Sequence, residues 1–275
     1  MNINSSFSHR REEPESSVLY LVGTPIGNLN DISSRAINIL KNVSLIACED
    51  TRQTKKLTSR FDISNRLISF NKHNSLTRIP KIINLLKEGK SIALVSDAGM
   101  PCICDPGEDL VNNVRLHNFE TICIPGPSAA LTALISSGFP ASKFIFEGFL
   151  PKKKKEREKI LSEISKNEKT TILFESPHRF KALLNELKEY CGAEREISIS
   201  RELTKKFEEN LNDKIVKIID VFKEREIIGE ITIVIKGIDK NNNETNKYEL
   251  RKELKELINA GLSLSAAAKY LAKKK

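Results

Sequence analysis

The chain has 275 residues, 39% of them hydrophobic and 29% charged, and carries a formal net charge of +9. This composition indicates a globular protein long enough for two ordinary domains, and no apolar run approaches the ~20 residues needed to cross a bilayer. Residues 1–17 are polar and lack the apolar segment of a secretory signal, so we expect a disordered tail and a cytoplasmic protein.

Positive charge is concentrated in two segments of the chain. Residues 152–159 hold six bases and two acids, and residues 247–275 hold eight bases and three acids. Clustered bases favour binding to a polyanion, because each phosphate contact releases condensed counterions. A solvated helix face explains such runs equally well, so charge alone does not identify the partner.

The five cysteines are an odd number, and most lie in apolar stretches: Cys48, Cys102, Cys104, Cys123 and Cys191. We therefore expect buried free thiols in a reducing compartment. Cys102 and Cys104 are too closely spaced for the usual zinc pair, and no histidine is near them, so we expect no metal site.

Short β-rich runs alternate with segments of helical periodicity in the first half of the chain, which is typical of α/β layering. The expected strands are residues 18–23, 45–48, 67–70, 91–96 and 120–124. Apolar residues recur at helical spacing around residues 36–43, 79–86 and 110–114. A first α/β domain over residues 18–125 follows from this order.

Pro125-Gly126-Pro127 interrupts the pattern and opens a helix over residues 128–137. The alternation then resumes, with expected strands at 143–148, 170–175, 195–201 and 230–236 and expected helices at 153–167, 179–191 and 213–224. We assign residues 126–238 to a second α/β domain and the polar residues 239–246 to a linker.

Beyond the linker, residues 247–275 are expected to form a helical appendage of two short helices, 247–260 and 263–272, separated at Gly261. The pair resembles a small helix-turn-helix. Docking on RNA and simple packing against the body of the protein are equally good interpretations of it.

Turns rich in small residues follow three of the expected strands, where open α/β sheets bind their ligands. Pro25 and Gly27 stiffen the first turn, which is neither a dinucleotide fingerprint nor a phosphate-binding P-loop. Asp97-Ala98-Gly99 forms the second turn and places an acceptor at a strand end, which suits a ligand with ribose hydroxyls or positive charge. Each turn alone could be a plain connection, but together with Pro127-Ser128-Ala129 they favour a bound cofactor.

Eight ordered motifs between about residues 19 and 237 resemble one family. They are Gly23–Leu29, Glu49–Arg52, Ser96–Gly99, Asp105–Gly107, Pro125–Ala129, Phe146–Pro151, Glu175–Arg179 and Arg201–Lys205. In these residues the chain resembles the small-subunit ribosomal RNA (cytidine-2′-O)-methyltransferases of the tetrapyrrole-methylase superfamily. The resemblance implies two α/β domains, S-adenosylmethionine in the cleft between them, a homodimer, and a cytidine ribose in the decoding region of 16S rRNA as substrate.

The resemblance and the strand-end positions together indicate the residues that bind the cofactor. They are Pro25, Gly27, Asp97, Ala98, Gly99, Pro127, Ser128, Ala129, Phe149 and Leu150. Met100, Cys102 and Cys104 stand where the family loop more commonly has Thr, Gly and Ser, so the contacts of that loop differ from the usual ones.

A ribose 2′-hydroxyl is a very weak acid, so an acceptor must take its proton as the methyl group is transferred. By resemblance and by strand-end position the candidates are Glu49, Asp50, Glu175 and Glu202, with the Glu49–Asp50 pair preferred. A structural ion pair that braces the cleft is the alternative for each acid, and the neutral imidazoles of His73 and His178 are alternative acceptors.

The expected RNA contacts are basic side chains and histidines beside the cleft: Arg52, His73, Lys152, Lys153, Lys154, Lys155, His178, Arg179 and Arg201.

Two other functions stay open. One is a methyltransferase of the same fold that acts on a tetrapyrrole or a protein side chain, and the other is a non-catalytic RNA-binding module.

Overall fold

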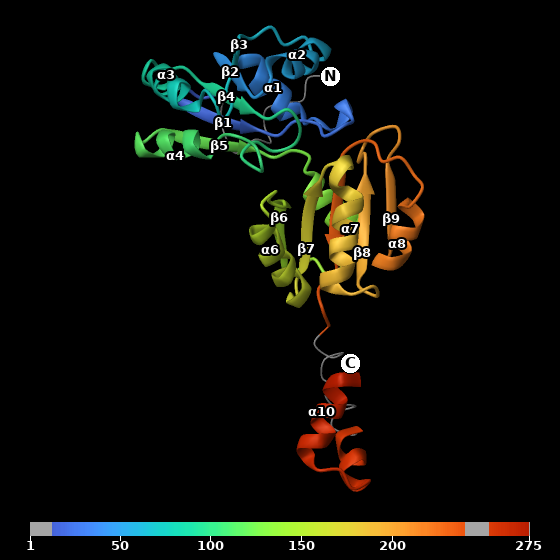
Figure 1. The fold of residues 1–275 in the computed structure, drawn as a ribbon. Coiled ribbons are helices and arrows are strands. Elements are labelled where there is room, and N and C mark those ends of the chain that lie inside the picture. The colour runs from blue at the N-terminus through green and yellow to red at the C-terminus, as the bar shows by residue number, and fades with distance from the viewer. Residues whose placement is uncertain (1–12, 240–252, 275) are drawn as a thin grey trace.

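The computed structural model describes residues 13–239 and 253–274 as two α/β domains and a helical C-terminal segment (Figure 1). The first sheet has the order β3-β2-β4-β1-β5, and every pair in it is parallel. Its strands are β1 (Val18–Val22), β2 (Leu45–Cys48), β3 (Leu67–Ser69), β4 (Ile92–Val95) and β5 (Glu120–Ile124). These bounds fall within two residues of the expected ones, and the predicted α/β class is confirmed.

Helices cover both faces of the first sheet, because alternate strand residues point to opposite sides. Tyr20 and Val95 pack on one side with α1 (Ser34–Asn42) and α2 (Thr51–Arg60). Leu19 and Leu94 pack on the other side with helices α3 (Ser75–Lys87) and α4 (Glu108–Leu116). The strand ends are therefore the edge of this domain that is left open to a ligand.

The second sheet has the order β6-β7-β10-β8-β9, in which only the β6–β7 pair is parallel. Its strands are β6 (Phe144–Phe149), β7 (Thr170–Glu175), β8 (Glu196–Arg201), β9 (Glu209–Lys214) and β10 (Ile231–Ile235). Helices α6 (Lys154–Lys166), α7 (Pro177–Cys191) and α8 (Ile215–Phe222) share one hydrophobic cluster on one face. Helix α5 (Ala129–Ser137) packs on the opposite face.

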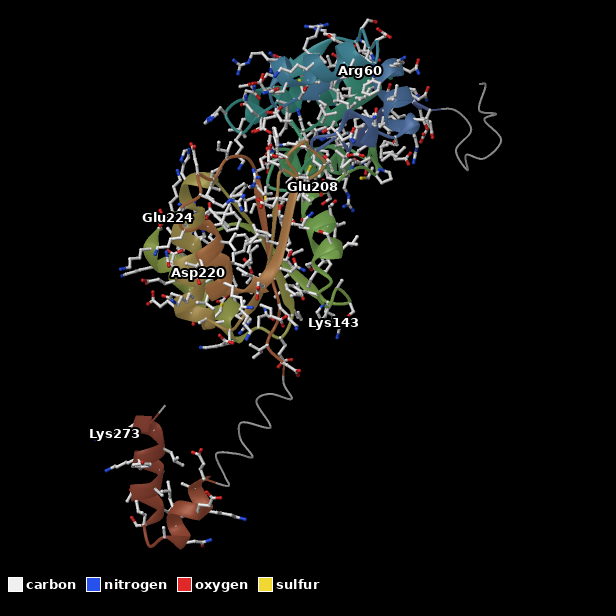
Figure 2. The ribbon with its side chains drawn as sticks, turned by 90° about the vertical axis from the view of Figure 1, so that its right-hand side faces the viewer. Arg60, Lys143, Glu208, Asp220, Glu224 and Lys273 are labelled. Atoms are coloured by element: carbon white, nitrogen blue, oxygen red, sulfur yellow. The ribbon has the colours of Figure 1, made fainter. Side chains whose placement is uncertain are left out.

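A hydrophobic cluster joins the two domains. Ile26, in the turn after β1, packs with Ala130 and Leu134 of α5 and with Leu203, which follows β8. The backbone N–H of Asn28 donates to the hydroxyl of Thr204, 3.0 Å away. Glu208 of the same second-domain segment lies at the side that faces the first domain (Figure 2).

Apart from a short 3-10 helix over Leu29–Asp31, two described elements were not expected, namely α2 and β9. Helix α2 buries only Thr54, Leu57 and Thr58, so its sequence shows no apolar stripe. Strand β9 is a polar edge strand whose residues are half-buried or exposed in alternation. Neither element carries the hydrophobic periodicity from which the other elements were predicted.

The two ends of the chain differ from expectation in detail. Residues 13–17, assigned to the tail, contact the first domain: Glu13 pairs with Arg35 at 2.6 Å, and the Ser17 hydroxyl donates to the carbonyl of Leu86. Residues 1–12 and the linker residues 240–246 lie outside the described residues. Residues 253–259 are helical, and α10 (Leu264–Lys274) begins after Ser263, whose hydroxyl accepts the N–H of Ala266.

Candidate active site between the domains

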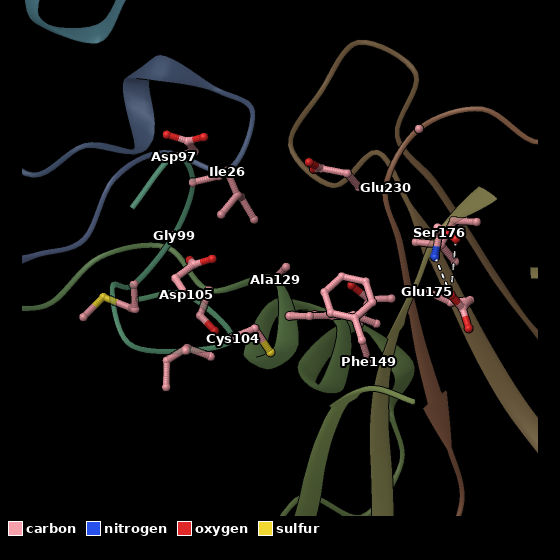
Figure 3. A pocket seen from close by; sticks show the side chains of 18 of the residues that line it. Ile26, Asp97, Gly99, Cys104, Asp105, Ala129, Phe149, Glu175, Ser176 and Glu230 are labelled. Carbon is pink, nitrogen blue, oxygen red and sulfur yellow. Dashed lines mark hydrogen bonds between the residues drawn. The ribbon is translucent and has the colours of Figure 1, made fainter. Parts of the chain in front are cut away.

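A cavity of about 480 Å³ lies between the two domains, and we call it the interdomain pocket. The first domain contributes residues from the ends of β1, β2 and β4 and from the loop after β4: Ile26, Glu49, Asp97, Ala98, Gly99, Met100, Ile103, Cys104 and Asp105. The second domain and α5 contribute Ser128, Ala129, Phe149, Phe174, Glu175, Ser176, Pro177, Gly229, Glu230, Ile231 and Thr232. Figure 3 shows Asp97 and Asp105 on the first-domain side, and Phe149, Glu175 and Glu230 on the second-domain side.

Backbone hydrogen bonds hold the first-domain wall together. The N–H of Thr24 donates to the carbonyl of Gly99 at 2.9 Å, and the N–H of Gly99 donates back to Thr24 at 3.1 Å. The Thr24 hydroxyl also donates to the carbonyls of Ser96 and Gly99. The turns after β1 and β4 are therefore one rigid unit, and Pro25 and Gly27 support the pocket without lining it.

The turn after β5 reaches the pocket through a close approach of two glycines. A Cβ on Gly126 would lie 2.7 Å from the Cα of Gly23, so neither position can carry a side chain without a backbone shift. This crossing brings Ser128 and Ala129 to the pocket wall. Pro127, assigned to the cofactor from sequence, precedes them and is not in the lining.

Three carboxylates of the first domain share the pocket, and each has an elevated pKa. Burial, followed by the charges of Asp105 and Asp97, raises the pKa of Glu49. Burial also raises the pKa of Asp97, although a hydrogen bond from the N–H of Asp50 acts to lower it. Burial raises the pKa of Asp105, although a hydrogen bond from Ser96 acts to lower it. The cluster is negatively charged and only partly solvated, which suits a cationic ligand.

Asp50, predicted as half of the preferred catalytic pair, is engaged at the start of α2. Its carboxylate caps α2 by accepting the N–H of Arg52, and it pairs with the Arg52 guanidinium at 2.6 Å. Hydrogen bonds from Arg52 lower the pKa of Asp50 to about 2. So weak a base is a poor proton acceptor, and Asp50 does not line the pocket.

Glu175 lines the pocket, but its carboxylate is engaged in a buried ionic network. Its side chain is fully buried, 3.0 Å from Arg179 and 3.7 Å from Arg157, which in turn pairs with Glu186 at 2.6 Å. Figure 3 shows the Glu175 carboxylate directed away from Phe149, with Ser176 donating to it. The bracing ion pair, weighed as the alternative for this acid, describes these contacts better than a general base does.

Glu202 lies behind the pocket wall. It holds Lys205 at 2.8 Å and accepts the N–H of Glu230. Burial acts to raise the pKa of Glu202, but the hydrogen bonds from Lys205 and Glu230 outweigh it and lower the pKa. The carboxylate thus positions Glu230, which lines the pocket, and does not line it itself.

The second-domain wall is mainly aromatic and apolar. Phe149 and Phe174 pack edge to face with their ring centroids 5.6 Å apart, and Phe149 remains 56% exposed. Leu150, expected beside Phe149 at the cofactor, is buried in the second-domain core instead, and its carbonyl accepts Arg179. An exposed aromatic face beside a polar cluster suits a ligand with both a planar ring and charged groups.

The predicted RNA contacts divide into exposed and engaged side chains. Lys152, Lys153, Lys154 and Lys155 are exposed at the start of α6, and His73, His178 and Arg52 are also exposed. Arg179 and Arg201 are engaged within the protein, Arg179 with Glu175 and Arg201 with Glu209 at 3.0 Å. Those two arginines therefore brace the fold and are poorly placed to bind phosphate.

Several pocket residues were missed from sequence. Asp105 and Cys104 lie in the long loop after β4 and were not assigned to the cofactor, and Glu230 directly precedes β10 instead of following a strand. Cys104 is exposed and not buried as expected for the thiols. Within residues 13–239 and 253–274, no group of three His, Cys, Asp or Glu side chains could hold a metal ion. In the same residues, no helix is both long and apolar enough to span a bilayer.

The known proteins that this chain resembles in sequence are methyltransferases. Residues 18–218 match the family model described as tetrapyrrole (corrin/porphyrin) methylases. The chain is 45% identical over 260 residues to "Ribosomal RNA small subunit methyltransferase I" of Bacillus subtilis, covering 94% of this chain and 88% of the relative. It is 47% identical over 219 residues to the protein of the same name from Thermotoga maritima, covering 80% of this chain and 98% of the relative.

Two solved structures share the fold at low sequence identity. A cobalt precorrin-4 methyltransferase matches with a TM-score of 0.62 at 14% identity, covering 80% of this chain and 95% of its own. A uroporphyrin-III-C-methyltransferase from Thermus thermophilus matches with a TM-score of 0.55 at 16% identity, covering 80% and 94%. At such identities the likeness is one of architecture.

Proposed function

This chain belongs to the tetrapyrrole methylase family, and from that premise we propose that it methylates the ribose 2′-hydroxyl of a cytidine in the decoding region of 16S rRNA. It is an S-adenosylmethionine-dependent methyltransferase of small-subunit ribosomal RNA. Beyond this activity, we propose that the methylated nucleotide is a cytidine and that the methyl group is transferred to its 2′-oxygen. The observation that carries it is the interdomain pocket, built from the motifs by which the chain resembles the cytidine-2′-O enzymes.

The pocket fits S-adenosylmethionine in its chemistry. The ligand has a sulfonium and an ammonium, which are cations, and an adenine ring. Asp97, Asp105 and Glu49 supply negative charge, and Phe149 supplies an aromatic face. Ala98, Gly99, Ser128 and Ala129 are small enough for their backbone to approach it closely. When bound, the cofactor supplies an electrophilic methyl group on sulfur.

The chain's own contribution to the chemistry is positioning and proton acceptance. In-line transfer requires the 2′-oxygen to be held against the methyl carbon, which a cleft walled by two rigid domains can do. The Glu49–Asp105 pair then accepts the hydroxyl proton, because its raised pKa makes it a stronger base than an exposed carboxylate.

The start of α6 supports the RNA-binding part of the proposal. Lys152 to Lys155 are exposed there, immediately after Phe149 of the pocket wall. Arg157, on the inner side of the same helix, is almost fully buried and fixes α6 to Glu186 of α7. A rigid helix with outward lysines beside the cleft can hold phosphates of the substrate strand.

A homodimer, also proposed, is supported by exposed apolar side chains around α5. Leu131 is 47% and Ile135 is 77% exposed, one helical turn apart, and Phe144 at the start of β6 is 39% exposed. A second copy of the chain is the occupant that the resemblance implies for this surface. The proposed ribosomal substrate also places the enzyme in the cytoplasm.

The test of the proposed function uses small ribosomal subunits from a strain lacking this gene. Incubation with the purified protein and S-adenosylmethionine is expected to restore one ribose methylation at a cytidine of the decoding region, mapped by mass spectrometry. Methyl incorporation at a base, at another nucleotide, or not at all would contradict the proposal. A tetrapyrrole substrate is not favoured, because the corrin and porphyrin enzymes share only the fold.

A further inference from the structure

A second cavity, of about 400 Å³, adjoins the interdomain pocket, and we call it the side pocket. The two share Cys104 and Asp105 in their walls, and the remaining lining residues of the side pocket all belong to the first domain: Phe70, Lys72, Ser75, Cys102, Pro106, Gly107, Glu108 and Asp109. The cofactor chemistry assigned above uses none of these other residues. A cavity of this size is large enough for one nucleotide base and its ribose.

Lys72 is presented to the side pocket by a rigid loop. The N–H of His73 donates to the side chain of Asn71 at 3.0 Å, and the N–H of Asn71 donates to the side chain of Asn74 at 2.9 Å. The Asn74 amide also donates to the carbonyl of Ser69 at the end of β3. These bonds fix the backbone on both sides of Lys72, so its exposed side chain starts from a defined position in the pocket lining.

The positive charge of Lys72 influences the pKa values of titratable groups near the wall that the two pockets share. Burial is the main cause that raises the pKa of Asp105, and Lys72 acts to lower it. Lys72 also acts to lower the pKa values of Glu49 and Cys104, again against burial as the larger cause. Lys72 and Asp105 line the same cavity, so the positive charge is part of the surroundings of a proposed proton acceptor.

Glu108 supplies a carboxylate to the lining of the side pocket. It is exposed, in the first turn of α4, and together with burial and Asp105 it acts to raise the pKa of Cys102 in the same wall. Gly107, the N-cap of α4, has no side chain with which to cap the first-turn N–H groups. The side pocket thus offers a carboxylate acceptor, an ammonium donor and the first-turn N–H groups of α4.

This combination matches the Watson–Crick edge of cytosine, which has one amino donor followed by two acceptors. A carboxylate accepts from the N4 amino group of cytosine, whereas it would face the O4 acceptor of uracil. An ammonium or a helix N-terminus can donate to N3 or O2 of cytosine. Recognition of this edge requires the target nucleotide to leave its stack, as in other enzymes that act on single nucleotides within nucleic acid.

We propose that the side pocket receives the target cytidine, with Glu108 accepting from its N4 amino group and Lys72 donating to its acceptor edge. The ribose then lies at the wall formed by Cys104 and Asp105, where the two pockets meet. This inference rests on the proposed function, and it adds which residues select cytidine over uridine. Glu108 and Lys72 bind substrate and take no part in cofactor binding.

The experiment compares small ribosomal subunits that carry either cytidine or uridine at the target position. Single-turnover methyl transfer with saturating S-adenosylmethionine is expected to favour cytidine for the unmodified enzyme by about tenfold or more, the discrimination of one good base-edge contact. Glu108→Gln, whose amide can donate to uracil O4, is expected to lower this ratio by about tenfold. Lys72→Met is expected to slow transfer to the cytidine substrate by a similar factor, with Lys72→Arg restoring part of it.

The matched control is Lys81→Met, because Lys81 is an exposed lysine of α3 outside both pockets. Cofactor affinity, measured by calorimetry, is expected to be unchanged in all four variants. If the unmodified enzyme methylates cytidine but Glu108→Gln keeps the same cytidine preference and Lys72→Met behaves like Lys81→Met, the side-pocket assignment is overturned and the proposed function stands. If the unmodified enzyme transfers no methyl group to either subunit, the proposed function itself fails.

Discussion

The carboxylates in and beside the interdomain pocket differ in what surrounds them. Glu49 and Asp105 are half-buried and Asp97 is more exposed, and partial loss of solvation is the first cause that raises the pKa of each. Asp50 is held by the guanidinium and the N–H of Arg52, which lower its pKa to about 2. Position at a strand end therefore does not by itself make an acid a base, and the local contacts decide its role.

Removing one of the two proposed proton acceptors should slow chemistry more than binding. Glu49→Gln and Asp105→Asn are each expected to slow single-turnover methyl transfer by at least about tenfold, equivalent to ~1.4 kcal/mol of barrier. Asp50→Asn and Glu202→Gln are the comparison variants and should change the rate by less than about threefold. Stopped assays at saturating cofactor and subunit measure the rates. Slowing below about tenfold for both Glu49→Gln and Asp105→Asn would leave solvent as the proton acceptor.

Asp97 should matter for cofactor binding. Asp97→Ala removes a pocket carboxylate and also leaves the N–H of Asp50 without its acceptor, so S-adenosylmethionine affinity is expected to fall by about tenfold or more. Titration calorimetry measures the affinity, with Asp220→Ala on the exposed side of α8 as the control (Figure 2). Unchanged affinity in a folded Asp97→Ala protein would remove Asp97 from the site.

The raised pKa of Asp105 has a consequence for stability. The folded protein binds the carboxyl proton of Asp105 more tightly than the unfolded chain does. The protonated carboxyl therefore adds to the free energy of unfolding at low pH, and this contribution is lost as the pH rises through the raised pKa. Asp105→Asn removes the buried charge and is expected to raise Tm at pH 7.5 by about 1–3 °C, with the difference shrinking toward pH 4. Thermal melts over this pH range measure it. A lower Tm for the variant at pH 7.5 would mean that the carboxylate stabilises the fold.

At this scale the sequence predicted the loops better than the individual side chains. Asp97, Gly99 and Ser128, predicted to bind the cofactor, line the pocket because each lies in the turn that follows a strand. Asp105 was not chosen, because it lies in a loop eight residues beyond Asp97, and the sequence shows no fold of that loop back to the strand ends. Cys102 and Cys104 both have positive φ there, a conformation that no residue pattern had indicated.

At the scale of elements, hydrophobic periodicity located most strands and helices to within a few residues. It could not locate α2 or β9, because each contributes little apolar surface to a core. Strand β9 is fixed by antiparallel pairing with β8 from Glu196 to Arg201, a tertiary interaction that local sequence does not encode. The elements that were missed are thus the ones held by contacts distant in sequence.

Helix α6 combines a buried inner arginine with exposed lysines at its start, and this separates its structural and binding roles. Replacing Lys152, Lys153, Lys154 and Lys155 together with Ser should weaken subunit binding and flatten its dependence on salt concentration, because fewer counterions are released. Cofactor affinity should not change. Filter binding over a salt series measures the affinity for the subunit and its dependence on salt concentration. Lys166, Lys169, Lys181 and Lys188, replaced together, provide a control of equal charge, and an identical salt slope in the two variants would mean that the α6 lysines do not touch RNA.

At the scale of the whole molecule, the apolar surface around α5 makes oligomeric state a test of the assembly proposal. Ile135→Asp places a charge on the most exposed apolar side chain of α5 and is expected to convert a dimer to a monomer in light scattering. Lys143→Glu, an exposed change beside Phe144, is the control for surface charge alone (Figure 2). A monomeric unmodified protein, or a dimer unaffected by Ile135→Asp, would contradict a dimer through α5.

The order of strands in the second sheet has a consequence for how the protein is made. Strand β10 is the last strand in the chain, yet it lies at the centre of that sheet, between β7 and β8. The first sheet is complete once Ile124 has been synthesised, so the first domain can fold while the rest of the chain is still being translated. The second sheet has no centre until Ile235 has left the exit tunnel. A nascent chain paused before β10 would therefore expose the inner edges of β7 and β8 together, the stage of synthesis at which it most needs a chaperone.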